Sequence, residues 1–277
     1  MGHPATRYLL FVIIVTLMPS ISTQAAEEEF DSARWKLQVN AWISAPTGYF
    51  NGRHGEGYFD LQRDFGFGNY ATSSGRLDWR FKRKHHLLFT VTPVNSSRST
   101  TLSRTINWQD DTFDVGIRTN ASVKSLLFTP GYQYDFFRFR QGSLGFLVNV
   151  NLAYTSATLK ASAGVSSSGS TVSASTSASG SLFAPLPAIG PTFRWYLVPN
   201  SSRLYLDGTL SGMSFFGYGN FGSGNGVLGF PLGRHWDAHA GYLLGSRLKI
   251  TGSSDNIAIR LTQKGPIFGI EYHWDLR

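Results

Sequence analysis

The chain has 277 residues, a formal net charge of +8, 42% hydrophobic residues and no cysteine. The absence of cysteine excludes thiolate metal sites, cysteine nucleophiles and a disulfide framework. After residue 25, no apolar run approaches the roughly 18–20 residues that a membrane helix needs, so a membrane protein with this sequence would have to cross by strands.

The N-terminus shows the three parts of a secretory signal peptide. Arg7 supplies a positive charge, Tyr8 to Met18 form an apolar core, and Thr23-Gln24-Ala25 has the small-x-small pattern of a cleavage site. The apolar core is too short to span a bilayer as a helix. We therefore expect residues 1–25 to be a cleaved signal peptide and residues 26–277 to form one exported barrel domain.

The rest of the chain alternates between apolar and polar residues. Such alternation predicts β-strands with one apolar and one polar face, and we find no convincing helical pattern after the signal peptide. Ten segments of this kind follow in chain order: 34–43, 71–81, 86–94, 120–134, 143–155, 187–197, 203–212, 225–232, 236–247 and 258–274. Short polar turns and long polar stretches separate them alternately.

The number of predicted strands is even, and both ends of the chain fall at the short-turn rim. The sequence therefore predicts an all-β fold: a closed antiparallel transmembrane β-barrel of about ten strands, with short periplasmic turns and long extracellular loops. Eight or twelve strands remain open at this point, because 57–67 and 101–108 could each pair as additional strands.

Tryptophans favour a membrane barrel over a soluble β-sandwich. Five of the 7 tryptophans fall at the short-turn rim with the apolar parity, namely Trp35, Trp79, Trp195, Trp236 and Trp274. An amphipathic ring is stable at the level of lipid headgroups, so a bilayer would select an aromatic girdle there. We expect these five residues to lie at the membrane interface.

Two segments resemble those of known membrane barrels. The last strand carries Phe268, Ile270, Tyr272 and Trp274 in alternation, and Gly75 to Phe81 precede a basic turn. In these features the chain is similar to uncharacterised bacterial outer-membrane β-barrel proteins of the porin-like superfamily. The resemblance implies a bacterial outer-membrane location, contact with outer-membrane lipids, and recognition of the last strand by the barrel-assembly machinery.

Charged residues with the polar parity should face the lumen, mostly in the half nearest the short-turn rim. They are Lys36, Arg76, Asp78, Arg80, Arg194, Asp207, Asp237, His239, Glu271 and His273, with Arg247 farther from that rim. Acids and bases are nearly balanced in this set, and a ten-stranded barrel is narrow. We therefore predict a cluster of mutual ion pairs that fills the lumen, since unpaired buried charges are costly.

A hydrolase is an alternative hypothesis. If the barrel closes, His239, Glu271 and Lys36 could lie side by side, and a histidine beside a carboxylate is half of a nucleophilic relay. No well-placed serine nucleophile completes it, so we assign no catalytic residue. The histidines also lack metal-ligand spacing, and we expect neither a metal nor a cofactor.

The polar turns and loops suggest two further roles. Residues 156–184 contain a low-complexity Ser-rich stretch whose alternation indicates a protruding hairpin turning near Gly169, so surface adhesion through this loop is a second alternative. The basic turn Lys82 to His86, together with Arg138, Arg140, Arg203 and Arg234, should attract anionic lipid headgroups. Nucleic-acid binding is a poor interpretation of such scattered turn residues, and the sequence predicts no oligomeric state.

Overall fold

The computed structural model describes residues 33–44, 47–51, 58–108, 111–167, 170–198, 204–215, 219–250 and 258–274. The expected signal peptide, residues 1–25, lies outside these described residues. No helix in the described part of the chain is long and apolar enough to cross a membrane.

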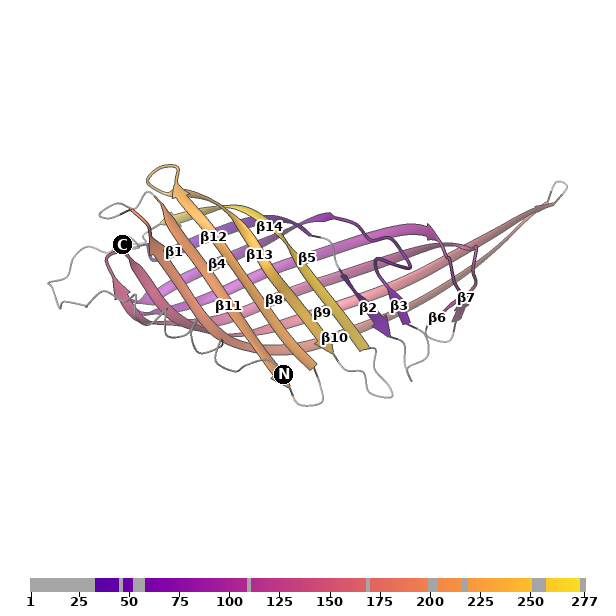
Figure 1. Cartoon of the computed structure of the whole chain (residues 1–277), viewed down its shortest axis with the longest axis horizontal. Helices are drawn as coiled ribbons and strands as arrows, with labels where there is room; N and C mark the ends of the chain where they lie inside the picture. The colour runs from indigo at the N-terminus through magenta and orange to yellow at the C-terminus, as the bar shows by residue number, and fades with distance from the viewer. Residues whose placement is uncertain are drawn as a thin grey trace, which may run out of the picture.

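Ten antiparallel strands close into a barrel (Figure 1). Its wall consists, in order, of β1 (Trp35–Ser44), β4 (Tyr70–Lys82), β5 (His85–Thr101), β8 (Arg118–Phe139), β9 (Gly142–Ser167), β10 (Ser170–Tyr196), β11 (Tyr205–Phe215), β12 (Gly219–Pro231), β13 (Trp236–Ile250) and β14 (Ala258–Trp274). The first and last strands pair from Trp35 with Trp274 to Trp42 with Ile267, which closes the ring. The predicted all-β barrel of about ten strands is confirmed.

Four short strands lie outside the closed wall. β2 (Thr47–Asn51) continues the line of β1 along β14, and β3 (Tyr58–Asp60) pairs with β2. β6 (Ile106–Trp108) and β7 (Asp111–Phe113) form a separate hairpin. The two segments that could have made a twelve-stranded wall therefore supply short strands at the long-loop end instead.

The two faces of the wall follow the predicted parity. Outward residues such as Val39 and Val148 are 49% and 48% exposed, whereas inward Asn149 is 8% exposed. Four girdle residues lie in one row: Trp35 stacks on Trp79 at 5.2 Å and on Trp274 at 6.2 Å, and Trp236 packs 4.7 Å from Tyr272. Since water would penalise so much exposed apolar surface, this outer face suits a bilayer.

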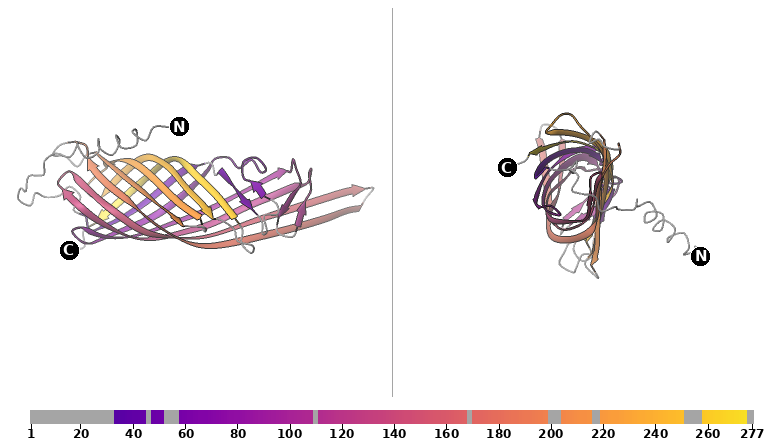
Figure 2. Two further views of the ribbon diagram at one scale, coloured as in Figure 1. Left: turned by 60° about the horizontal axis from the view of Figure 1, so that its bottom comes forward. Right: turned by 90° about the vertical axis from the view of Figure 1, so that its left-hand side faces the viewer.

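The hairpin of β9 and β10 projects beyond the rest of the barrel (Figure 2). Its strands pair without interruption from Gly142 with Trp195 out to Ser167 with Ser170. The chain therefore reverses between Ser167 and Ser170, which confirms the hairpin that the alternating Ser-rich sequence predicted.

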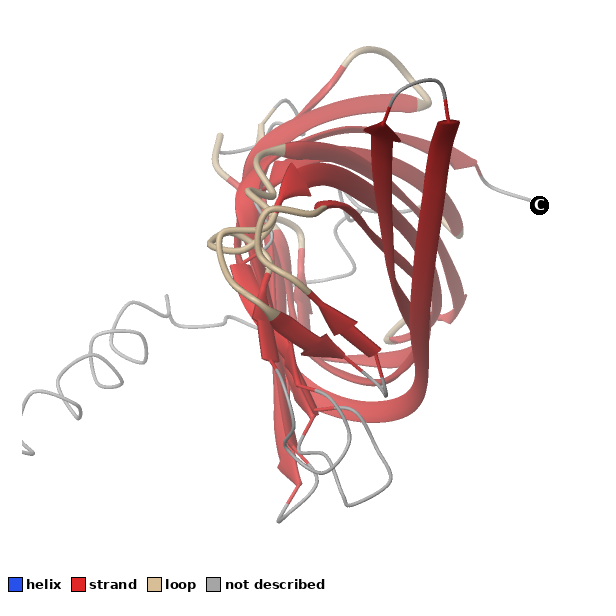
Figure 3. Cartoon of the chain, turned by 90° about the vertical axis from the view of Figure 1, so that its right-hand side faces the viewer, coloured by secondary structure: helices blue, strands red, loops and turns tan. Residues whose placement is uncertain are grey.

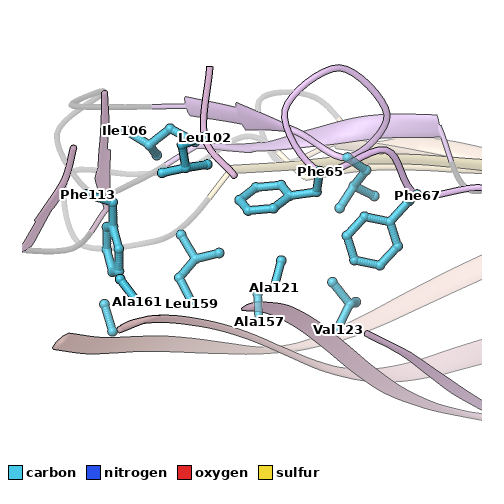
Figure 4. Close-up of a cluster of buried hydrophobic side chains, with 12 residues drawn as sticks. Phe65, Phe67, Leu102, Ile106, Phe113, Ala121, Val123, Ala157, Leu159 and Ala161 are labelled. Atoms are coloured by element: carbon cyan, nitrogen blue, oxygen red, sulfur yellow. The ribbon is translucent and has the colours of Figure 1, made fainter. Parts of the chain in front are cut away.

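An apolar core fills the long-loop end of the barrel (Figure 4). Phe65 and Phe67 come from the segment before β4, and Leu102, Ile106 and Phe113 come from the connection between β5 and β8. They pack on small inward residues of β8, β9 and β10, including Ala121, Ala157 and Ala178, and Leu261 of β14 joins from across the lumen. The long loops therefore fold over this end of the barrel, which Figure 3 views end-on.

A β-bulge in β13 corrects one prediction. Leu243 pairs with Gly265 but Ser246 pairs with Gln263, so β13 carries one extra residue between these two pairs. The bulge reverses the parity of the residues that follow it. Arg247 is therefore exposed on the outer face opposite Thr262, and its predicted lumen-facing position is wrong.

Candidate functional site

The lumen near the short turns contains an ion-pair group centred on Arg194 of β10. Its guanidinium donates to Asp207 of β11 at 2.8 Å and to Glu271 of β14 at 3.3 Å. It also lies 4.6 Å from the ring centroid of Tyr205. β14 is not a neighbour of β10 in the wall, so Arg194 reaches across the lumen. One cation thus compensates two carboxylates and ties opposite walls together.

A second ion-pair group surrounds His86, at the start of β5. The imidazole lies 2.9 Å from Asp78 of β4 and 3.2 Å from Asp135 of β8. Arg138 donates to Asp135 at 2.9 Å, and both side chains are almost fully buried. His86 lies on β5 and contacts Asp78 of β4 and Asp135 of β8, so it joins these three neighbouring strands at one level of the lumen.

Three members of this second group were misplaced or missed in the sequence analysis. We assigned His86 and Arg138 to a basic turn facing lipid headgroups, but both lie inside the barrel. Asp135 follows the predicted strand 120–134, whereas β8 continues to Phe139 with an irregularity between Asp135 and Phe137. This group could be found only from the exact ends of β5 and β8. Polar residues near a turn do not specify where a strand ends.

The other predicted lumen residues are distributed around these two groups. Asp237 pairs with His273 at 3.3 Å, and Lys36 is 7% exposed. Arg76 lines both the space among these charges and the larger polar cavity next to it in the lumen. Arg80 lies on β4 at the inward parity, next to His86 in the register. The free volume among these charges is about 40 Å³, little more than one water molecule.

His239 does not form the acid–histidine pair that the hydrolase hypothesis requires. Its Nε2 contacts the amides of Asn40 at 2.6 Å and Gln38 at 3.1 Å. Its Nδ1 is buried and has no partner among the described residues. Glu271 receives the Arg194 guanidinium instead. No described group of three His, Cys, Asp or Glu side chains is arranged to hold a metal ion.

A polar cavity of about 200 Å³ occupies the middle of the lumen, lined mostly by uncharged side chains, with Arg76 and Asp207 also among its lining residues. Its lining is rich in amides and hydroxyls, including Asn149, Asn225 and Thr209, with Trp42 and Phe221 as aromatic members. The indole Nε1 of Trp42 is buried without a hydrogen-bond partner among the described residues. The cavity therefore offers hydrogen-bonding groups to water or a small neutral solute, between charges at one end and apolar side chains at the other.

A buried carboxylate links the two segments that cover the long-loop end. Asp64 is 1% exposed and accepts from Arg104 at 2.6 and 3.0 Å, while Arg63 donates to it at 3.0 Å. Burial by itself would raise the pKa of Asp64, but the hydrogen bonds from Arg104 and Arg63 outweigh burial and lower the pKa to about 2. The covering segments are thus joined by a charge-assisted contact outside the barrel wall.

Acid should loosen this contact. The pKa of Asp64 is lower in the folded protein than in the unfolded chain, so its stabilisation is complete above about pH 4 and is lost as the pH falls toward about 2. We expect the protection of residues 61–67 from hydrogen exchange to weaken over that window. The free energy of local opening should fall by on the order of 1–2 kcal/mol. Asp64→Asn should show weak protection throughout and no pH step. An unchanged step in that variant would assign it to another group.

No family model matches the chain. No curated protein matches it either. Among solved structures it resembles the outer-membrane protease OmpT from Escherichia coli with a TM-score of 0.54 and 12% identity, over 91% of this chain and 100% of that one. The toluene transporter TodX from Pseudomonas putida has a TM-score of 0.38 and 8% identity, over 90% of this chain and 92% of that one. The attachment invasion locus protein Ail of Yersinia pestis has a TM-score of 0.34 and 9% identity, over 85% of this chain and 99% of that one. The fold is that of bacterial outer-membrane β-barrel proteins.

Proposed function

We propose that this chain is an integral, non-catalytic β-barrel of a bacterial outer membrane, exported by residues 1–25, that is structural or a narrow pore for small solutes. One observation carries the proposal: a polar, mostly uncharged cavity of about 200 Å³ lies between an ion-pair network and an apolar core. Charged side chains pair with one another at one end of the lumen, and apolar side chains pack together at the other end. Such a lumen holds water or one small solute but does not provide a wide aqueous channel.

The charged half supports a structural role. Arg194, Asp207 and Glu271 come from β10, β11 and β14, so their contacts hold distant parts of the wall in register. The nucleophilic relay of the hydrolase hypothesis would instead need a nucleophile beside a base that another group orients. The amide contacts of His239 do not provide that arrangement.

Conductance of single channels tests this proposal. The purified protein in a planar bilayer should give no current, or a current far below that of a 16-stranded porin measured in the same bilayer, because ten strands enclose a narrow lumen. Phe65→Ala together with Arg104→Ala should loosen the covering segments and lengthen any openings. A large, steady current through the unmodified protein would contradict a closed lumen.

The projecting hairpin supports a second candidate function, surface adhesion. β9 and β10 continue as a paired ribbon well beyond the other strands, which places the Ser-rich stretch of the chain outside the barrel (Figure 1). Deletion of residues 163–174 should leave barrel assembly intact, since β9 pairs with β8 only as far as Ser162, and Ser162 itself pairs with Ser175 of β10. Loss of binding of intact cells to a surface, with normal barrel abundance, would favour adhesion.

A further inference from the structure

The outer wall of the barrel carries a groove of about 710 Å³ over β10 to β14. Gly212, Gly222 and Gly224 face outward along its floor; no side chain lies near Gly212 or Gly222, whereas Leu210 and Leu244 lie over Gly224. A Cβ added at Gly222 would meet no other atom within 4 Å. Apolar side chains border the groove, and among them are Ile189 at 47%, Leu210 at 52% and Leu244 at 64% exposure. The shape and lining suit a flexible hydrocarbon chain.

Four cations face outward at the long-loop end of the same wall. Arg247 and Lys264 line the groove, and Lys249 and Arg260 follow on β13 and β14. Lys249 is directly opposite Arg260 in the register, and like charges in that position are destabilising. In the described part of the chain none of the four has an ion-pair partner. Bound anionic groups would remove this repulsion.

The cations stand at the level expected for lipid headgroups. A transmembrane strand takes about 9–11 residues, and Arg247 follows the girdle residue Trp236 by about 11 positions. Lys264 precedes Trp274 by about 10 positions on β14, which is the same distance from the girdle. The bulge in β13 is what directs Arg247 outward to this level. Groove and cations therefore meet where a lipid changes from acyl chain to headgroup.

We propose that this groove binds a phosphate-bearing acyl lipid of the outer leaflet. One acyl chain lies over Gly212 and Gly222 beside Leu210 and Leu244, and a headgroup phosphate contacts Arg247 and Lys264. The neighbouring cations Lys249 and Arg260 accommodate a second negative charge. This inference rests on the proposed location in an outer membrane, but it is independent of whether the lumen conducts.

Native mass spectrometry of the protein in detergent tests the inference, with a diphosphorylated lipid A as the probe. The folded barrel should retain one lipid. Arg247→Gln with Lys264→Gln should weaken retention roughly 30-fold, because each cation near a headgroup contributes about one kilocalorie per mole. Gly222→Leu should weaken retention to a similar extent while leaving every charge in place, because the side chain would occupy the groove.

Two matched variants serve as controls. Lys124→Gln removes a cation from the outer face of β8, and Gly226→Leu adds the same side chain at an outward glycine that also has open space but lies outside the groove. Both should retain the lipid. Equal retention by the Arg247 and Lys264 variant would overturn the proposal, as would full displacement by inorganic phosphate alone. A dimer that Gly222→Leu dissociates would instead identify a second copy of the chain as the occupant.

Failure of this inference can be told apart from failure of the proposed location. A heat-modifiable gel shift and fractionation with outer membranes report insertion, whereas lipid retention reports the groove. A protein that inserts normally but retains no lipid would refute the groove and leave the location standing.

Discussion

Replacing Val148 by arginine should destabilise the barrel by about 2–4 kcal/mol and reduce its assembly, because the side chain at the middle of β9 faces outward. Val148 is 48% exposed, and its neighbours across the ladder are Tyr132 and Ile189, which are also exposed. In a bilayer these side chains contact lipid. An arginine there would have to bring its charge into hydrocarbon or bend toward a distant headgroup.

Asn225→Arg is the matched control at an inward position. Asn225 lines the polar cavity and pairs in the register with Thr209 and Leu243, so a longer polar side chain has room and hydrogen-bonding partners. We expect a smaller loss of stability than for Val148→Arg. The measurement is the midpoint of urea unfolding in detergent-free lipid vesicles, followed by heat modifiability on gels. Equal destabilisation by the two variants would show that the outer face does not contact lipid.

The alternation of residues was sufficient to predict the fold. Each of the five strands with a girdle tryptophan keeps the same parity from that residue into the middle of the barrel, as in β1 from Trp35 to Ile43. Periodicity of two is a local property of the sequence, so no information about distant residues was needed. The closure of β1 on β14 followed from the even number of strands and the common rim of the two ends.

Bulges explain where the sequence failed. A bulge adds one residue to a strand without any composition signal of its own, and every later side chain then faces the opposite way. Arg247 was misplaced for this reason, after the irregularity between Leu243 and Ser246. A Leu-Leu-Gly run at 243–245 interrupts the alternation, and this was the one local sign available.

The long-loop end could not be predicted because its contacts are between loops. Phe65, Phe67 and Phe113 lie in segments without regular alternation, and their partners on β8 and β9 are small residues such as Ala121 and Ala157. Small inward residues leave room for large side chains from elsewhere in the chain. That complementarity depends on the tertiary fold, and neither segment indicates it alone.

Charge pairing was predicted as a property of the set, but the partners were not. The balance of acids and bases indicated mutual compensation, whereas the structure makes Arg194 the common partner of Asp207 and Glu271. Which cation serves two anions depends on the reach of its side chain across the lumen. His86, Asp135 and Arg138 add a second group that the strand ends concealed.

Arg194→Ala should therefore be the most damaging single substitution in the lumen. It leaves Asp207 and Glu271 without their shared cation, and breaking a buried pair from one side costs about 3–5 kcal/mol. The aromatic contact with Tyr205 would be lost as well. We expect a lower unfolding midpoint in vesicles, together with brief cation-selective currents, because the charged half would lose positive charge and side-chain volume.

Neutralising the two acids in the same chain should restore most of that loss. Arg194→Ala with Asp207→Asn and Glu271→Gln has no uncompensated carboxylate, and replacing a whole buried ion group by uncharged side chains is often close to neutral in stability. The triple variant should also lose the cation selectivity, since both acids responsible for it are gone. Lys124→Gln, on the outer face, should affect neither quantity. If Arg194→Ala alone is as stable and as silent as the unmodified barrel, the network does not close the lumen.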